Sequence, residues 1–516
     1  MTGKDFLILL AIGLSGYTLA GQANIVRSSR YITFDAGSDH FTNNLYGPAR
    51  WWFDNYLQSP YMAVEERKNI PDNDARAMSA ISGQRLGLTS GENELLRFIA
   101  AYYPDPSTTP AILEVASHYY NQRTFDKAVK FYSMVDLEDL PQYDMSEAAF
   151  KKGYSLFVTK SFREAKNEFE KAINIQDEYY HSSNYYYGLC DYFMGSYAGA
   201  VKSFEKVKYS EQYRSFVPYY LTQIYMAQKQ YPKVIASGEE ALKDPNLRNR
   251  TEIRQLTGQA YFSLGEYEKA LPHLEYYESK TEKLTVEEFF QLGFTHYQLK
   301  KYPGAIKNFL ELNLLENKLG QQVNYYLADS YYRTGDKVSA RSAFRKVSQM
   351  DFVPSLRDEA AFNYAKLSAE SGYEREAIST LLRIEASSPY YAESQSIMND
   401  LLAATSDYEY AMTVIEGMKN PGEKVKNTHQ LAGLNYGILH LKNARTDDAM
   451  KAFDRSTKFG TNKSATAQAK YWTACILQDK GDFKRSITVM EEFLSLANGQ
   501  SGLPASSSAV MGHYTQ

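Results

Sequence analysis

Cysteine is almost absent from this chain of 516 residues, which contains only Cys190 and Cys475. A long stretch of sequence separates the two, and each lies in a segment with a helical pattern of apolar residues. We therefore predict no disulfide between them, and expect each to serve as a small apolar side chain.

The motifs that usually mark an active site are also missing. The eight histidines are dispersed, and none belongs to a set with the ligand spacing of a metal site. The chain has no phosphate-binding loop, no nucleophile elbow and no zinc-protease helix motif. Neither cysteine has a neighbouring histidine that could activate it. We expect no enzymatic activity, no bound metal and no cofactor.

Charge of one sign is not in excess either. The net charge is −4, and lysine and arginine are scattered along the chain rather than clustered in a stripe. A nucleic-acid partner is not expected, because such proteins carry a basic surface. Glycine (30 residues) and proline (16) are modest, whereas tyrosine is abundant with 44 copies. This composition favours long helices with aromatic packing.

A repeated pattern runs through most of the chain, in which an aromatic residue is followed three positions later by a small one. Six pairs show it: Phe125 and Ala128, Phe162 and Ala165, Tyr197 and Ala200, Tyr231 and Val234, Tyr267 and Ala270, Tyr302 and Ala305. The small position returns at Ala340, Ala377, Ala411, Ala449 and Ser486, always after 34 to 38 residues. Such a period indicates a stack of one supersecondary unit.

Each unit is predicted to contain two helices. In residues 251–279, Leu256, Ala260 and Leu264 recur at helical spacing, and Gly265 then separates them from a second apolar stripe. A small residue also lies in the first helix, about twelve positions before the small residue of the second. It is found at Ala116, Gly153, Gly188, Gly258, Gly293, Ala328, Ala365, Gly437 and Ala474. Small residues on both helices allow their backbones to approach closely.

This pattern resembles the tetratricopeptide repeat (TPR). When the small residue of the second helix is numbered position 20, the chain repeats small at 8, Tyr at 11, aromatic at 17 and 24, and small at 27. The resemblance covers residues 109–500 as eleven units. It implies an all-α fold, a right-handed superhelical solenoid of about eleven to thirteen helix-turn-helix units. Departures are visible: Val234 and Ser486 replace Ala, Lys337 replaces the aromatic residue, and the Ala411 unit lacks the small residue of its first helix. We expect looser packing or a change in the superhelical path there.

The chain divides into four predicted segments. Residues 1–22 are interpreted as a cleaved signal peptide, 23–108 as degenerate N-terminal repeats that cap the stack, 109–496 as the TPR array, and 497–516 as a flexible tail rich in Gly and Ser. No C-terminal capping helix is evident. Either the last helix caps the array, or the chain is the N-terminal part of a longer protein.

The N-terminal segment has the features of an export signal. Lys4 precedes an apolar stretch, and Thr18, Leu19 and Ala20 offer small residues near a cleavage point. A membrane anchor and the first helix of the array are the alternatives. No cysteine follows the apolar stretch, so we expect no lipid attachment there. With residues 362–367 and Tyr471-Trp472, the chain also resembles long exported TPR proteins of Bacteroidetes, which implies a periplasmic or outer-membrane-associated location.

In TPR proteins the first helices line a concave surface, and the resemblance implies that positions 5, 9 and 12 face it. Aromatic residues dominate positions 5 and 12, which share one face of the helix. We predict partner contacts at Tyr120, Phe150, Tyr154, Phe157, Tyr185, Tyr192, Tyr219, Phe262, Phe290, Phe294, Tyr297, Tyr325, Asp329, Tyr332 and Phe362. The residue at position 9 varies between apolar, polar and charged types. No cluster of Lys, Asn and Arg that would bind a carboxylate is apparent.

The predicted function is that of an envelope scaffold, which binds protein or peptide segments in this aromatic groove and organises a multiprotein complex. One alternative is a glycan-binding TPR protein associated with the outer membrane. Against it stand the missing lipid-attachment cysteine and the uninterrupted run of repeats. Another alternative is the binding half of a longer sensor protein. The oligomeric state is not predicted.

Overall fold

The computed structural model describes residues 29–59 and 71–498. In these ranges every regular element is helical, with 26 α-helices, α2 to α27, and two short 3-10 helices, η3 (Pro106–Thr108) and η4 (Leu137–Asp139). The all-α fold class is therefore confirmed. The predicted signal segment 1–22 lies outside the described residues, as does the tail from residue 499 onward.

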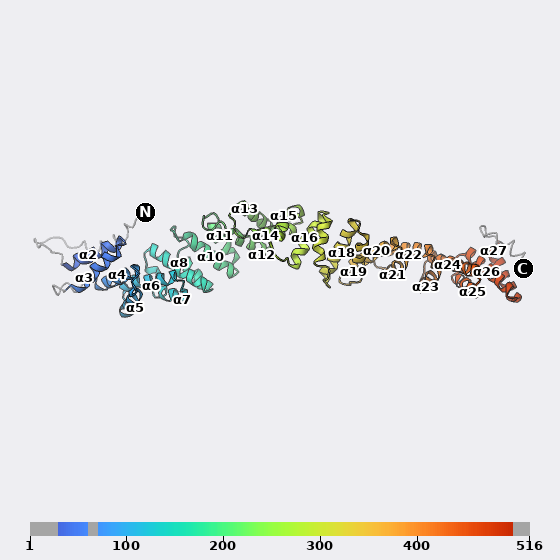
Figure 1. Ribbon diagram of the computed structural model, residues 1–516, viewed down its shortest axis with the longest axis horizontal. Coiled ribbons are helices and arrows are strands. Elements are labelled where there is room, and N and C mark those ends of the chain that lie inside the picture. Colours follow the sequence, from blue (N-terminus) through green and yellow to red (C-terminus); the bar gives the residue numbers. More distant parts are fainter. Residues whose placement is uncertain (1–28, 60–70, 499–516) are drawn as a thin grey trace. The chain divides into compact units, whose positions relative to one another are not determined.

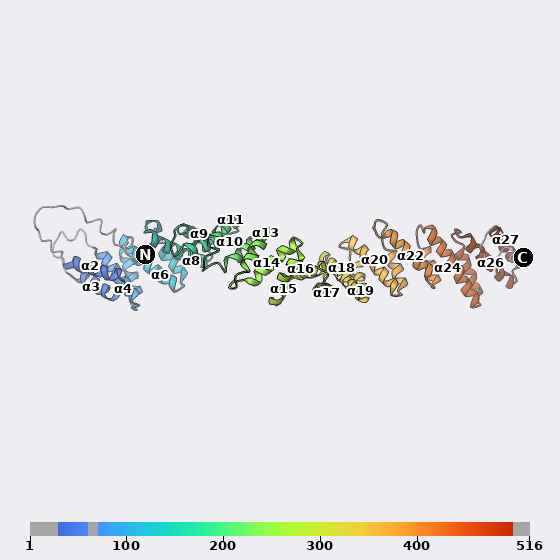
Figure 2. The ribbon, with the colours of Figure 1, turned by 90° about the horizontal axis from the view of Figure 1, so that it is seen from above.

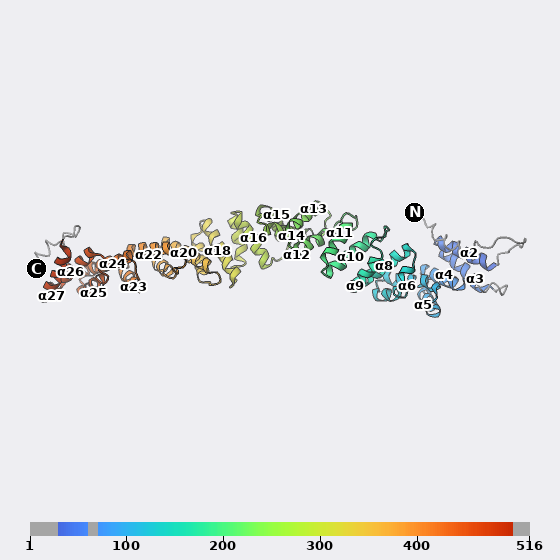
Figure 3. The ribbon, with the colours of Figure 1, turned by 180° about the vertical axis from the view of Figure 1, so that it is seen from behind.

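The helices form two compact units, which divide after Leu256 within α14 (Arg250–Ser263). The first unit holds α2 (Ser29–Thr42), α3 (Tyr46–Gln58), α4 (Asp72–Arg85), α5 (Gly91–Tyr102), α6 (Thr109–Asn121), α7 (Phe125–Tyr132), α8 (Gln142–Val158), α9 (Phe162–Glu170), α10 (Tyr180–Phe193), α11 (Tyr197–Val207), α12 (Val217–Ala227) and α13 (Tyr231–Ala241). Its helices follow one another in chain order in Figure 1 and, from behind, in Figure 3.

The second unit is built in the same way. It holds α15 (Tyr267–Lys280), α16 (Val286–Gln298), α17 (Tyr302–Leu310), α18 (Lys318–Arg333), α19 (Lys337–Ser348), α20 (Pro354–Glu370), α21 (Glu374–Leu381), α22 (Tyr391–Ala404), α23 (Tyr408–Glu416), α24 (Glu423–Lys442), α25 (Thr446–Ser456), α26 (Lys463–Asp479) and α27 (Phe483–Ala497). Figure 2 shows these helices from above, again in chain order. The even-numbered helices from α6 to α26 are the first helices of the repeats, and the odd-numbered ones from α7 to α27 are the second.

The small residues of both helices lie where the helices touch, as predicted. The small residue at position 20 is buried in all eleven repeats, and among them only Ser486 keeps any exposed surface, 7%. In the first helix, Gly293 faces the ring of Phe309 so closely that a Cβ would lie 2.8 Å from Cε1. The same relation holds between Gly153 and Phe169. The repeat pattern therefore encodes the contact between paired helices.

The turn between paired helices uses a left-handed residue at position 15. Glycine supplies it at Gly265, but Lys160 and Lys300 adopt it with φ of 64° and 58°. The variable residue type hides this feature in the sequence. Residues other than glycine rarely adopt φ near +60°, so its recurrence shows that the two-helix packing imposes the turn.

The repeat of α22 and α23 departs from the others, as its missing small residue predicted. The backbones of α22 and α23 do not approach as closely as those of most other pairs. Asn399 occupies the position that is Gly or Ala in nine repeats and Thr222 in the repeat of α12, and the fully buried side chain of Met398 lies in the core beside it. The left-handed turn is also absent, because Thr405 ends α22 in an extended conformation. Larger side chains thus hold this pair apart.

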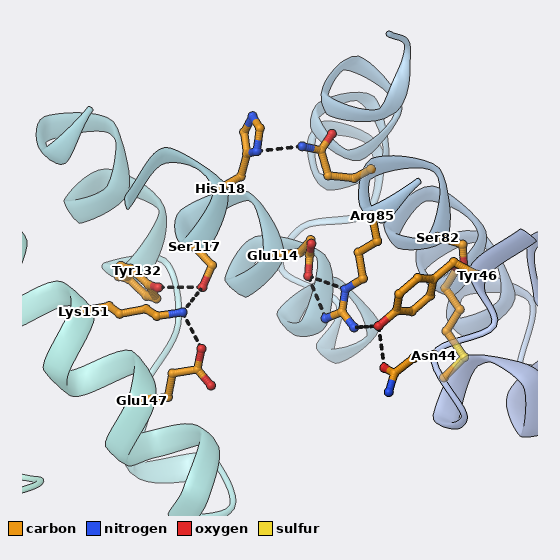
Figure 4. A network of polar contacts seen from close by, with 12 residues as sticks. Asn44, Tyr46, Ser82, Arg85, Glu114, Ser117, His118, Tyr132, Glu147 and Lys151 are labelled. Carbon is orange, nitrogen blue, oxygen red and sulfur yellow. Dashed lines mark hydrogen bonds and ion pairs between the residues drawn. The ribbon is translucent and has the colours of Figure 1, made fainter. Parts of the chain in front are cut away.

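The N-terminal helices join the repeats through polar contacts (Figure 4). Arg85 of α4 donates from Nε and Nη2 to Glu114 of α6, at 3.0 and 2.8 Å, and from Nη1 to the hydroxyl of Tyr46 on α3 at 2.8 Å. One helix pair further on, Lys151 of α8 donates to Ser117 of α6 at 3.1 Å. One arginine and one lysine therefore link four helices.

A cluster of three ionisable side chains connects α23, α24 and α25. His429 has no exposed surface, and its Nε2 lies 2.8 Å from Oε1 of Glu416. Arg455 donates from Nε to the same oxygen at 3.1 Å. Burial lowers the pKa of His429, although Glu416 opposes this. Burial would raise the pKa of Glu416, but the hydrogen bonds from Arg455 and His429 outweigh it and lower that pKa. The histidine is therefore held neutral beside a charged carboxylate.

This arrangement predicts a loss of stability in mild acid. In the unfolded chain a histidine takes up a proton near pH 6.5, whereas folded His429 resists protonation until lower pH. The unfolded state then binds more protons, so the free energy of unfolding falls as pH drops below about 6.5, by about 1.4 kcal/mol for each unit of pKa depression. Urea unfolding at pH 7.5, 6.5 and 5.5 measures this, and the fall should be smaller in His429→Gln.

The matched control is His181→Gln, since His181 is exposed. It should keep the pH dependence of the parent. If the free energy of unfolding fell equally with pH in the parent and in His429→Gln, other groups would be the cause of the pH dependence.

Candidate binding surface on the first helices

Most of the predicted aromatic rows pack between neighbouring first helices. Tyr154 of α8 lies 5.7 Å from Tyr120 of α6 and 5.0 Å from Tyr186 of α10, measured between ring centroids. Phe157 lies 5.2 Å from the same Tyr186 ring. Contacts at these distances bury much of each ring. The rows therefore form the seams between adjacent repeats, and only part of them remains open.

A third set of aromatic residues, at position 6, completes these seams. Tyr186, Tyr220 and Tyr326 each stack on the position-24 phenylalanine of the preceding repeat, with centroid distances of 5.9, 5.6 and 6.0 Å. These residues are not among the contacts predicted from the sequence. Their signal was the doubled tyrosine, since each directly follows a tyrosine at position 5.

Residues at position 12 are matched to position 9 of the next repeat. Tyr192 donates its hydroxyl to Gln223 at 2.5 Å, and Tyr297 donates to Asp329 at 2.8 Å. Where position 12 is Phe262, the facing residue is another phenylalanine, 6.1 Å away between centroids. At these three junctions the residue at position 9 therefore suits the hydrogen-bonding capacity of position 12 in the preceding repeat.

Two predicted contact residues lie in the core. Tyr185 is 7% exposed and stacks on Tyr213 at 4.1 Å, and Phe362 is 5% exposed and stacks on Tyr390 at 5.2 Å. The segments before the next first helices cover these two side chains, and their contact with a partner stays a prediction. Tyr332 is exposed. The remaining predicted residues are half-buried: Tyr120, Phe150, Tyr154, Phe157, Tyr192, Tyr219, Phe262, Phe290, Phe294, Tyr297, Tyr325 and Asp329.

Four of the predicted residues meet at one cavity of about 300 Å³ on α16, α18 and α20 of the second unit. Tyr297 comes from α16, Tyr325, Asp329 and Tyr332 from α18, and the opposite wall from α20. The other lining residues are Arg333, Phe344, Glu359, Asn363, Lys366, Leu367 and Glu370. Members of both predicted aromatic rows therefore share one open space here.

The cavity lies where the matching of positions 12 and 9 fails. Tyr332 is at position 12, but the next repeat places Lys366 at position 9, and an ammonium group cannot accept the phenol proton. Within the described chain the hydroxyl of Tyr332 has no hydrogen-bond partner, and 48% of the residue is exposed. The seam therefore stays open at this point.

Two carboxylates in the cavity are already paired with tyrosines. Tyr297 donates to Oδ2 of Asp329 at 2.8 Å, and Tyr325 donates to Oε1 of Glu359 at 2.5 Å. Burial, followed by the adjacent carboxylate, raises the pKa of both tyrosines. Both phenols therefore stay protonated, and their hydrogen bonds fix the two carboxylates at the side of the cavity.

The groups left with spare hydrogen-bond donors are Tyr332, Arg333, Asn363 and Lys366. Arg333 reaches Asp329 only through Nε, at 3.4 Å, and Lys366 lies 3.7 Å from Glu393. The sequence showed no cluster of Lys, Asn and Arg, because about thirty residues separate Arg333 from the other two. The fold brings them to one cavity together with carboxylates. This surface can donate hydrogen bonds and offer an aromatic face.

Two kinds of site are not found in the described part of the chain. Residues 29–59 and 71–498 contain no group of three His, Cys, Asp or Glu side chains that could hold a metal ion. Over the same ranges no helix is both long and apolar enough to cross a membrane.

Comparison with known families matches residues 322–349 to a model described as tetratricopeptide repeat. This match covers α18 and α19, the pair that supplies Tyr325, Asp329 and Tyr332. Residues 322–349 are thus similar to a TPR. No curated protein matches the sequence. The matched segment contains three of the predicted contact residues, all on α18.

The chain is also similar to several solved structures, with TM-scores below 0.5. A mutant of MamA is 19% identical over 35% of this chain and 95% of its own, with a TM-score of 0.27. A tetratricopeptide repeat protein from Parabacteroides merdae is 14% identical over 52% of this chain and 98% of its own, with a TM-score of 0.28. A chain of Naa15/Naa10 bound to HypK-THB is 11% identical over 91% and 76%, with a TM-score of 0.37.

Proposed function

We propose that this chain is a scaffold that binds segments of partner proteins, and that the cavity on α16, α18 and α20 is a contact site. The observation that carries the proposal is the open seam at Tyr332, where phenol, guanidinium, amide and ammonium donors surround one cavity. A polypeptide segment offers carbonyl acceptors and side chains that match such a mixed surface. An exposed tyrosine at its rim suits a contact with a protein.

We further propose that the chain acts outside the cytoplasm, in the periplasm or at the outer membrane, where it organises an envelope complex. The support is the N-terminal sequence, with Lys4 before an apolar stretch and small residues at 18–20. The natural source of partners for a test is therefore an envelope extract.

Site-specific photo-crosslinking tests the contact site. A photoreactive phenylalanine in place of Tyr332 should crosslink a partner protein in envelope extract. Tyr332→Ala combined with Lys366→Ala should reduce capture of the same partner about tenfold, since it removes two central contacts. Quantitative mass spectrometry of the captured proteins gives the measurement.

The matched control uses Tyr143 of α8, which is 55% exposed and lies far along the chain from the cavity. The photoreactive residue there should give no crosslink to that partner, and Tyr143→Ala should leave its capture unchanged. Equal capture by both alanine variants would disprove the contact site. A glycan that displaced the partner from Tyr332 would favour the carbohydrate-binding alternative.

A further inference from the structure

A second cavity lies in the first unit, on α11, α12 and α13, and has a volume of about 390 Å³. The helices α11 and α13 are second helices of their repeats, so this cavity does not belong to the seam of first helices. The segment that connects α11 to α12 contributes Tyr209 and Arg214 to its rim. None of the contact residues predicted from the sequence lines it.

The floor of this cavity is apolar. Leu221 and Ala241 are 4% and 8% exposed, and Pro218 and the ring of Tyr225 lie beside them. At the rim Tyr209 is 79% exposed, which is unusual for so large a ring. An apolar group of a ligand could therefore pack on Leu221 and Tyr225 and be covered by Tyr209.

The acidic residues around the cavity each have a cationic neighbour. Glu205 pairs with Lys208, and Glu240 pairs with Lys243 at 2.6 Å. Asp244 uses Oδ1 to accept from the backbone N–H of Asn246, and its Oδ2 lies 3.8 Å from Nε of Arg214. Glu205 and Glu240 are therefore compensated by lysines, whereas Asp244 has only the long contact with Arg214.

Among the residues described, two cations at the cavity, Lys233 and Arg214, lack a carboxylate at hydrogen-bond distance. Lys233 lies over the ring of Tyr225, 5.5 Å from its centroid, and forms no ion pair with any residue that the structure describes. The Arg214 side chain is 53% exposed, and its single carboxylate contact, at 3.8 Å, is too long for a hydrogen bond. Both cations thus keep donors for an anion above an apolar floor.

We propose that this cavity binds a ligand in which an apolar body carries one anionic group. The body would pack on Leu221 and Tyr225, and Lys233 and Arg214 would bind the anion. The volume lies at the lower end of the range for small-molecule sites, which suits one aromatic or aliphatic group rather than a folded domain. Free organic acids and the C-terminal residue of a polypeptide share this chemistry. The proposal is independent of the site at Tyr332.

The probe is 8-anilinonaphthalene-1-sulfonate, an aromatic anion whose fluorescence rises in apolar surroundings. Titration of the full chain should reveal a saturable site. Affinity for it should fall about tenfold in the double variant Lys233→Gln with Arg214→Gln, because charged hydrogen bonds are lost. Ala236→Phe, on the exposed side of α13, should abolish the site by filling the cavity without removing a charge.

Lys202→Gln is the matched control, since Lys202 of α11 is exposed and does not line the cavity. It should bind the probe like the parent. Circular dichroism and urea unfolding establish that each variant keeps its fold. If the variants at 214, 233 and 236 are folded and all bind the probe as the parent does, the proposal is overturned.

Competition distinguishes the two sources of the ligand. N-acetylphenylalanine carries the carboxylate of a polypeptide end, and octanoate represents a free organic acid. Displacement by either acid supports the proposal, and the stronger competitor identifies the source. N-acetylphenylalanine amide has the same body without the charge and should compete at least about tenfold more weakly. Equal competition by the amide would overturn the role of Lys233 and Arg214.

Discussion

Replacing Phe309 with alanine is expected to lower the free energy of unfolding of the second unit by about 3–5 kcal/mol. Phe309 has no exposed surface, and its ring lies between Gly293 of its own repeat and Tyr326 of the next. Truncation would leave a cavity that cannot collapse, because the backbones of α16 and α17 already touch there. The urea midpoint and hydrogen exchange of amides in α16–α18 measure the effect.

The matched control is Phe483→Ala. Phe483 is 63% exposed, so the same truncation should cost less than about 1 kcal/mol. In a repeat array each repeat contacts only its neighbours, so amides in α24–α27 should keep their protection in Phe309→Ala. Equal losses in the two variants would contradict the assignment of Phe309 as the residue that joins successive repeats.

Gly437→Leu is expected to destabilise the second unit by about 2 kcal/mol, although leucine is the better helix former. Gly437 lies in α24 against the ring of Phe453, and a Cβ there would be 2.7 Å from Cζ. Helix propensity alone predicts a gain of about 0.8 kcal/mol. Overpacking costs about 1–3 kcal/mol, and the upper end applies here because Phe453 has no exposed surface into which it can move. The cost therefore outweighs the gain in helix propensity. Urea unfolding measures the net change.

Gly47→Leu provides the control, because a Cβ at Gly47 in α3 would meet no atom within 4 Å. That variant should be neutral or slightly more stable. The double variant Gly437→Leu with Phe453→Ala should be less destabilised than the sum of its single changes, because the leucine enters the space that the ring leaves. Strict additivity would show that steric conflict with Phe453 is not the cause of the loss.

The sequence predicts the contact between paired helices well because that contact depends on residue size. Ala270, Ala305 and Ala340 are buried where expected, and so is Gly293. Size is visible in a residue type, and a strict period repeats the signal many times. The open repeat of α22 and α23 was predicted for the same reason, since Asn399 is too large for its position.

The candidate site was predicted less completely, because exposure depends on the neighbouring repeat. Tyr185 and Phe362 occupy the same repeat position as Tyr325, yet they are buried by residues of the following segment, such as Tyr213. Tyr332 is open only because Lys366 follows one repeat later. A periodic alignment of positions treats each repeat alone and cannot show such pairs. The cavity at Tyr209 was missed because the segment between repeats falls outside the periodic pattern.

The matching of position 12 to position 9 of the next repeat constrains how this gene could gain or lose repeats. For example, a deletion of the repeat of α18 and α19 with both breakpoints between repeats would place Tyr297 opposite Lys366 in place of Asp329. The phenol of Tyr297 would then have no acceptor. A deletion with both breakpoints between positions 9 and 12 would carry every matched pair along intact. Duplications obey the same rule. Recombination that preserves the stack should therefore cut inside the first helix, although the linkers look like the natural boundaries.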